Sequence, residues 1–151
     1  MTKDATSANH GSQEEQSSHQ SVTDKSYTFS KKEKLCSRRS FDLLFQDISS
    51  FHAGRLWVAY KTDLPPELVT APLMVAFAVP KRNFKRAVHR NLLKRRMREA
   101  YRLNKASAIR KFEEKGQHAA FLIKYNSREI RSFSEIEKDM RYALRRIRKL
   151  V

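Results

Sequence analysis

The sequence predicts an α+β fold, in which a small mixed sheet of about four strands packs with three helices in the order α-β-β-β-α-β-α. Two observations support this class. Short runs rich in apolar, aromatic and β-branched residues are typical of strands. Longer segments repeat apolar residues every three or four positions, as in a helix buried on one face. The 151 residues leave room for one compact domain of ordinary size.

The first 28 residues are expected to form a disordered polar tail, and residues 29–151 a single domain. Ser, Gln, Asn, Thr and His make up most of the tail. Lys3 and Lys25 against four acids give it a net charge of −2, so the rest of this +16 protein carries +18. A segment this polar cannot bury enough surface to offset the entropy lost on ordering.

The first helix is predicted over residues 38–48, with Ser37 as its N-cap. Apolar residues recur along it at helical spacing, at Phe41, Leu44, Phe45 and Ile48. Two phenylalanines one turn apart allow two interpretations. Core packing is the favoured one, and a stacking surface for unpaired bases is the alternative.

Strands are predicted at residues 55–61, 73–79 and 119–125, with a short edge strand at residues 50–52. In the first of these, alternation places Leu56, Val58 and Tyr60 on one face and Trp57 and Ala59 on the other. Residues 73–79 are almost wholly apolar, which indicates a strand buried on both faces.

The most distinctive stretch runs from Lys81 to Leu103. Up to Arg102 it holds ten Lys or Arg and one acid, Glu99. On a helix, five polar residues fall within an arc of roughly 100°: Asn91, Lys94, Arg95, Arg98 and Arg102. Leu93, Met97, Ala100 and Tyr101 lie opposite. A solvated face normally mixes charges of both signs, so the spacing predicts a polyanion-binding surface. Four basic residues before the helix extend this surface: Lys81, Arg82, Lys85 and Arg86.

The segment from Lys105 to Gly116 could extend this helix. A final helix is predicted from Ser132 or Ser134, both possible N-caps, to Lys149. Its own basic face is interpreted as ordinary solvated surface, because acids begin the helix.

Composition limits the possible partners. The net charge of +16 and the pI near 10.3 point to nucleic acid first and to an anionic membrane second. No apolar run is long enough to span a membrane, and the N-terminus lacks the apolar core of a secretory signal. Cys36 is the only cysteine, which excludes an internal disulfide and a cysteine-based zinc site. We therefore expect a soluble cytoplasmic protein.

No catalytic residues and no metal site are predicted. The chain contains no G-x-S-x-G, HExxH, Walker or CxxC motif. Its carboxylates are scattered rather than clustered as a two-metal nuclease requires. Because Arg and Lys in excess suit phosphates, the residues indicate a protein that binds the backbone of a folded RNA. DNA is not expected, since strands interrupt the three-helix frame of a homeodomain-like reader.

The stretch PKRNFKRAVHRNLLKRRMREAYRL resembles the signature of the protein subunit of bacterial ribonuclease P. The resemblance covers residues from about 30 to the C-terminus, including both neighbouring strands. Leu92 stands where many members have Arg, and Lys85 where some have Gly. The matching positions are Lys81, Arg82, Ala87, Val88, Arg90, Asn91, Lys94, Arg95 and Arg98.

The resemblance implies a division of labour. In this family a large RNA is the catalyst, and it positions Mg²⁺ to remove the 5′ leader of precursor tRNA. The protein binds that RNA and the leader, so we expect the isolated protein to be inactive and to hold no metal of its own. The resemblance also implies a left-handed crossover through the basic helix, and a leader cleft between the first helix and the sheet lined by Phe41, Phe45 and Tyr60.

Two rivals remain at this point. One is a ribosomal-protein-like RNA-binding module or chaperone with no processing role, and the other is a stand-alone protein nuclease. A cleavage assay with and without the RNA subunit separates all three.

Overall fold

The protein, described here as a computed structural model, is an α+β sandwich with one four-stranded sheet. The structure describes residues 28–35 and 38–151. The predicted tail, except for Thr28, and the predicted N-cap Ser37 therefore lie outside the described residues. The elements are η1 (Lys31–Glu33), α2 (Arg38–Gln46), β1 (Ser49–Ala53), β2 (Leu56–Lys61), η2 (Pro66–Leu68), β3 (Leu73–Ala78), α3 (Ala87–Asn104), α4 (Ala106–Glu114), β4 (Ala119–Tyr125) and α5 (Phe133–Arg148).

The strands lie in the order β1-β2-β4-β3. The β1–β2 and β2–β4 pairs are antiparallel, and β3 runs parallel to β4. The chain returns from β3 to β4 through α3 and α4, so these two helices form the crossover. The mixed sheet is therefore as predicted, while the left hand of the crossover stays a prediction.

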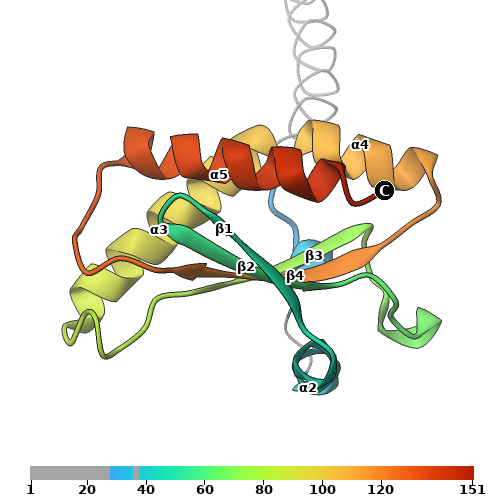
Figure 1. The fold of residues 1–151 in the computed structure, drawn as a ribbon, viewed down its shortest axis with the longest axis horizontal. Coiled ribbons are helices and arrows are strands. Elements are labelled where there is room, and N and C mark those ends of the chain that lie inside the picture. The colour runs from blue at the N-terminus through green and yellow to red at the C-terminus, as the bar shows by residue number, and fades with distance from the viewer. Residues whose placement is uncertain (1–27, 36–37) are drawn as a thin grey trace, which may run out of the picture.

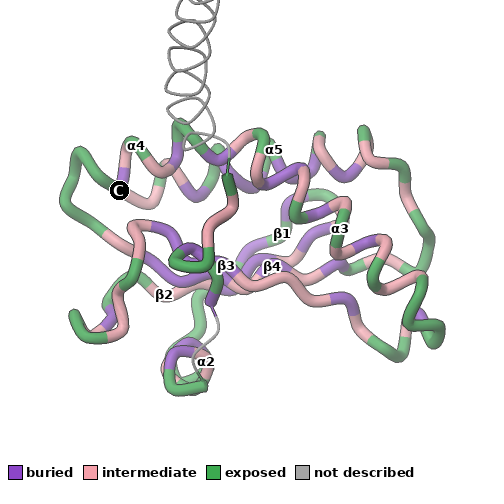
Figure 2. Tube along the Cα trace, turned by 180° about the vertical axis from the view of Figure 1, so that it is seen from behind, coloured by how far each residue is buried: buried purple, intermediate pink, exposed green. Residues whose placement is uncertain are grey.

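The two faces of the sheet are covered unequally (Figure 1). The helices α3, α4 and α5 lie on one face, where they and the sheet enclose the main core around residues such as Val58, Met97, Phe121 and Met140. The single helix α2 lies on the other face, over a smaller cluster that includes Leu44, Met74 and Ala120. Burial is accordingly concentrated between the sheet and the three-helix layer (Figure 2).

The strand predictions are close to the observed bounds, and the run at residues 119–125 is matched in full by β4. In β3, Leu73, Met74 and Val75 are buried, but the second half of the strand is half-buried. Burial on both faces is therefore correct only for the first half. The N-cap Ser132 is confirmed, because its hydroxyl accepts a hydrogen bond from the Glu135 backbone amide at 3.4 Å.

The prediction of three helices is wrong by one: the described residues form four α-helices. The basic helix ends at Asn104 and does not continue to Gly116, because α4 begins as a separate helix at Ala106. The Asn104 side-chain amide donates to the Ala100 carbonyl at 2.8 Å, a local bond that competes with the backbone ladder. Lys105, at the junction, is buried and pairs with Glu33, a contact that sequence spacing cannot reveal.

The β1–β2 hairpin is clamped to α5. Its two-residue loop, Gly54 and Arg55, has positive φ only at Gly54, the pattern of a type II′ turn. The Asp139 carboxylate of α5 accepts from the Arg55 backbone amide at 3.1 Å and from its guanidinium at 3.2 Å. This clamp fixes the sheet edge against the helix layer.

Candidate nucleic-acid interface

The basic face of α3, defined as Asn91, Lys94, Arg95, Arg98 and Arg102, lies on the outside of the helix layer. Asn91, Arg95 and Arg98 are exposed, and Lys94 and Arg102 are half-buried. On the opposite side Leu93, Met97, Ala100 and Tyr101 are all fully buried in the main core. The predicted division of this helix is confirmed, and its cations are anchored from behind by packed apolar residues.

Residues 81–86, which precede α3, add four exposed cations beside its first turn: Lys81, Arg82, Lys85 and Arg86. The first turn of α3 contains no acid, and its N-cap, Arg86, offers no side-chain acceptor. Free backbone N–H groups at this helix start therefore point into a basic environment, which favours an anion.

Arg90 differs from the other predicted RNA-binding residues. Its guanidinium donates to the Phe84 carbonyl at 2.8 Å and to the Lys85 carbonyl at 2.9 Å. Phe84 in turn is buried and packs its ring against Tyr125, with centroids 5.9 Å apart. Arg90 thus holds the basic loop against the sheet, and part of its hydrogen-bonding capacity is used within the protein.

Arg102 is also engaged. It pairs with Glu99, the one acid of the basic stretch, through bonds of 2.6 and 3.0 Å. The hydrogen bonds from the Arg102 guanidinium hold the pKa of the Glu99 carboxyl below its ordinary value. The net charge of the face is consequently concentrated on Lys94, Arg95 and Arg98, nearer the start of the helix.

The sheet face that carries α2 is only partly covered. Beyond α2, one row of registered neighbours crosses all four strands: His52, Trp57, Lys124 and Ala78. The next row is Ser50, Ala59, Leu122 and Ala76. We call these eight residues the open sheet face. Ala59 of the second row is fully buried, and Ala76 and Leu122 pack against the smaller cluster under α2, so the first row is the uncovered part.

Trp57 and Lys124 are the chemically distinctive pair on the open sheet face. Both are half-buried, and the Lys124 ammonium lies 4.9 Å from the centroid of the Trp57 ring. A flat aromatic ring beside a fixed cation can stack a base and pair with its phosphate. Sequence reasoning did not select either residue, although alternation along the strand had already placed Trp57 on this side.

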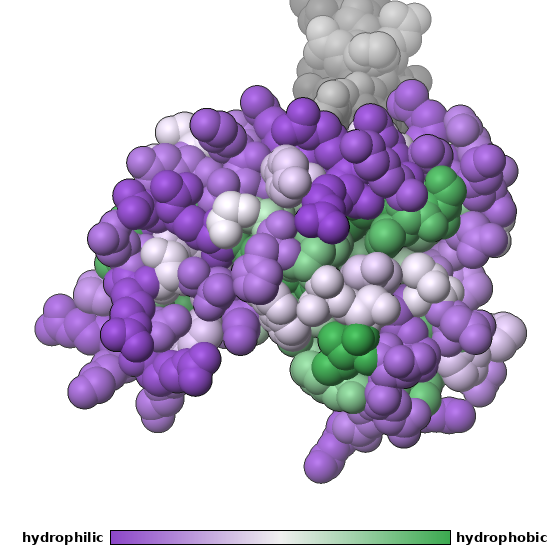
Figure 3. Space-filling view, in the orientation of Figure 1, coloured by the Kyte–Doolittle hydropathy of each residue, from purple (hydrophilic) through white to green (hydrophobic). Residues whose placement is uncertain are grey.

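Two phenylalanines of α2 stand at the edge of the same face. Phe41 is half-buried and packs on the smaller core cluster, whereas Phe45 is 50% exposed. The space-filling view shows a hollow beneath the sheet between α2 and the polar lobe around the start of α3 (Figure 3). The core-packing interpretation therefore holds for Phe41, while base stacking on the exposed ring of Phe45 stays a prediction.

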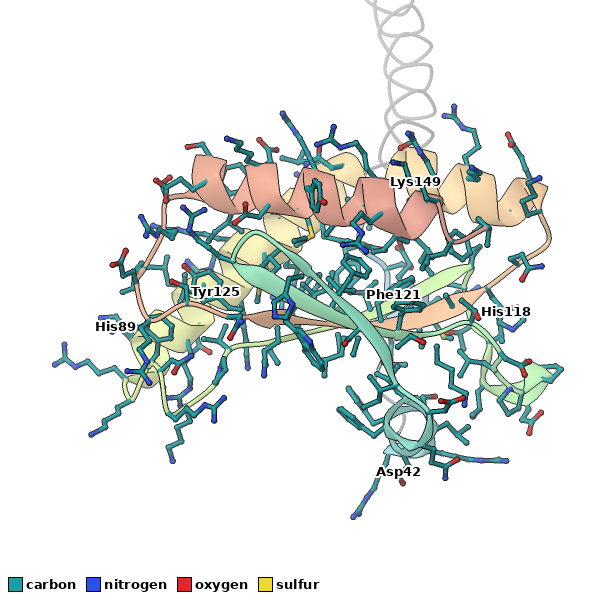
Figure 4. All side chains as sticks on the ribbon, viewed as in Figure 1. Asp42, His89, His118, Phe121, Tyr125 and Lys149 are labelled. Carbon is teal, nitrogen blue, oxygen red and sulfur yellow. The ribbon has the colours of Figure 1, made fainter. Side chains whose placement is uncertain are left out.

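The structure does not bring Tyr60 into this hollow. Its ring lies on the other face of the sheet, 6.0 Å from those of Phe51 and Phe121, which belong to the main core. Phe121 lies between the sheet and the helix layer (Figure 4). The predicted trio is thus corrected to Phe41 and Phe45 alone, because the two-residue period of β2 turns Tyr60 away from α2.

The part of the chain that the structure describes contains no group of three or more His, Cys, Asp or Glu side chains that could hold a metal ion. None of the helices in the described ranges is long and apolar enough to cross a membrane.

Comparison with known proteins assigns the family. The sequence model of the family described as Ribonuclease P matches residues 29–148. A ribonuclease P protein component from Porphyromonas gingivalis is 32% identical over 121 residues, which cover 80% of this chain and 87% of the relative. A ribonuclease P protein component from Chlorobaculum tepidum is 34% identical over 111 residues, which cover 69% of this chain and 72% of the relative.

Solved structures agree on the fold. A Staphylococcus aureus RNase P protein mutant with defective mRNA degradation activity superposes with a TM-score of 0.56 at 17% identity, over 84% of this chain and 92% of that one. A second structure of the S. aureus RNase P protein superposes with a TM-score of 0.55 at 14% sequence identity, over 75% of this chain and 93% of that one.

Proposed function

Because this chain belongs to the ribonuclease P protein family, we propose that it binds the family's catalytic RNA and the 5′ leader of precursor tRNA, and so assists removal of that leader. Family membership implies an RNA partner and a role in tRNA processing within a ribonucleoprotein. We propose that two different surfaces of this chain bind the catalytic RNA and the leader.

The basic face of α3 and the loop before it are proposed to bind the catalytic RNA. Their exposed cations, Arg95 and Arg98 with Lys81 and Arg82, suit phosphates rather than base edges. Asn91 is the one exposed amide among them. This chemistry supports recognition of RNA shape and backbone.

The open sheet face is proposed to hold the single-stranded leader. The observation that carries this proposal is the pairing of Trp57 with Lys124, 4.9 Å apart, on an uncovered sheet that ends at the exposed ring of Phe45. Stacking on aromatic rings is sequence-tolerant, because every base has a flat face. A leader of varied sequence needs that tolerance.

The chemical step is proposed to belong to the RNA. Mg²⁺ would then be held mainly by RNA phosphates, with this protein supplying no metal ligands and no catalytic group. The lack of a three-ligand cluster among the described residues is compatible with that role. The holoenzyme is proposed to work in the cytoplasm.

A leader-dependence experiment tests the proposal. With the reconstituted holoenzyme, Trp57→Ala and Phe45→Ala should each weaken binding of a long-leader precursor by about 1–3 kcal/mol, the range for stacking on one aromatic. Binding of mature tRNA, which has no leader, should not change. Trp57→Phe is the matched control, because it keeps a ring.

Equal losses for the precursor and for mature tRNA would contradict leader binding at this face and assign both residues to the fold. If neither variant altered binding, while the protein still bound RNA generally, an RNA chaperone would be the better description.

A further inference from the structure

A second basic surface lies on the C-terminal half of α5. From Arg141 to Lys149 the chain carries five cations and no acid. The acids that begin the helix are already engaged: Glu137 pairs with Arg141 at 3.2 Å, and Asp139 pairs with Arg55. Within residues 28–35 and 38–151, Arg145, Arg146 and Lys149 have no carboxylate partner.

These three cations surround a pocket with aromatic walls, which we call the C-terminal pocket. It measures about 460 Å³, and its lining includes Phe51, Tyr60, Tyr142, Arg145, Arg146 and Lys149, with no Asp or Glu. The volume falls within the range of small-ligand sites, about 300–1,000 Å³.

The cations of the pocket are oriented by its rings. The Arg146 guanidinium lies 4.4 Å from the centroid of the buried Phe51 ring, and that of Arg145 lies 5.9 Å from Tyr142. A guanidinium over a ring gains a cation–π attraction, and its N–H groups can still donate to an anion. Tyr142 is 45% exposed, so one face of its ring is available.

The C-terminal pocket lies on the opposite side of the sheet from Trp57 and Lys124, and only Ser50 of the edge strand β1 belongs to both surfaces. Its strand residues, Phe51 and Tyr60, point to the helix side of the sheet. Lys149 lies above the sheet and Asp42 of α2 lies below it (Figure 4). The four-stranded sheet therefore lies between the rings of the C-terminal pocket and the Trp57–Lys124 pair.

We infer that the C-terminal pocket binds single-stranded RNA. Arg145, Arg146 and Lys149 pair with its phosphates, and Tyr142 stacks a base. The helix dipole also stabilises cations in the last turn of a helix. That effect does not explain why these cations lie around exposed and half-buried rings. Phosphates alternating with flat bases match that combination, whereas an acidic peptide would leave the rings unused.

Arg145 connects the C-terminal pocket with a second basic pocket farther along α5. It also lines a neighbouring pocket of about 450 Å³ with Arg141 and Arg148. Bound nucleotides therefore have a continuous row of cations to follow from the C-terminal pocket toward α4.

Photocrosslinking with a seven-nucleotide oligouridylate tests the inference on the full chain. With 4-thiouridine at the central position, irradiation followed by mass spectrometry should show crosslinked residues within 133–151, in addition to those on α2, α3 or the open sheet face. Titrating the yield at each peptide gives a separate apparent Kd for each site, so a failure here is distinct from a failure of the leader proposal.

Two variants and their controls define the expected result. Tyr142→Ala should weaken the C-terminal site roughly 5-fold to 100-fold, and Tyr142→Phe should not. R145Q/R146Q should flatten the salt slope of that site by about 1.4, at about 0.7 per phosphate contact. K111Q/K115Q removes the same charge from Lys111 of α4 and from Lys115, the C-cap of that helix, and both lysines lie outside the lining of the pocket.

The inference is overturned if no crosslinked residue falls within 133–151. It is also overturned if R145Q/R146Q and K111Q/K115Q weaken the site equally, since net charge alone would then explain the binding. Because Tyr142 is exposed, Tyr142→Ala should leave the circular dichroism spectrum unchanged, which separates lost binding from lost folding.

Discussion

At the scale of single residues, Gly54 is a position where an added side chain would meet both backbone strain and a close contact. Its φ is +58°, and a Cβ built there would lie 2.2 Å from Oδ1 of Asp139. A side chain would therefore combine backbone strain with a steric clash against the carboxylate that clamps the hairpin. That clamp also holds Trp57 and Phe51 in place, because both lie on the hairpin strands.

We predict that Gly54→Ala lowers the free energy of unfolding by more than the roughly 1–2 kcal/mol expected from left-handed backbone strain alone. Urea unfolding of the isolated protein measures this loss.

Gly116→Ala is the matched control. Gly116 also has a positive φ, +63°, but an added Cβ there meets nothing within 4 Å. It should show the strain without the clash. Equal losses of unfolding free energy for the two variants would mean that the clash between the added methyl group and Asp139 does not destabilise the protein.

Tyr60 shows where prediction by resemblance and prediction by chemistry diverge. Alternation along its strand placed it opposite Trp57, and the registered pairs confirm that arrangement. The resemblance grouped it with Phe41 and Phe45, which the sheet separates from it. The alternation that turns Tyr60 away from α2 was already visible in the sequence, although it was not used to choose between Tyr60 and Trp57.

At the scale of elements, α3 is the part of the molecule that sequence describes best. Its cationic and apolar sides follow from helical spacing alone, and both are observed. The bonds from Arg90 to the carbonyls of Phe84 and Lys85 could not be foreseen, because they depend on the path of the loop. The ion pair between Lys105, which follows the helix, and Glu33, 72 positions away in the sequence, could not be foreseen either.

The basic face of α3 yields a salt-dependence prediction. Arg95→Gln and Arg98→Gln should each flatten the log–log slope of RNA affinity against salt by roughly 0.7–0.9, the contribution of one phosphate contact. Because both side chains are exposed, stability should change little. Affinity for the catalytic RNA, measured over a salt series, gives the slope.

Lys115→Gln provides the comparison for this series, since Lys115 is an exposed cation at the end of α4. It should leave the slope nearly unchanged. An unchanged slope for both arginine variants, accompanied by loss of folding, would instead make the two arginines structural.

At the scale of the whole molecule, the unequal covering of the sheet is the central feature. Three helices bury one face, and α2 leaves much of the other open (Figure 1). Residues 29–151, which build this scaffold, carry a net charge of +18. This arrangement leaves two separate surfaces, the open sheet face and the basic face of α3, on opposite sides of the scaffold for the RNA contacts proposed above.

The central claim is that this protein assists an RNA catalyst. Reconstitution with the cognate ribonuclease P RNA tests it most directly, by following cleavage of precursor tRNA over a Mg²⁺ series. The account predicts no cleavage by the protein alone, and correct 5′ maturation by the complex at lower Mg²⁺ than the RNA alone requires. Cleavage without RNA, or an unchanged Mg²⁺ requirement when the protein is added, would contradict it.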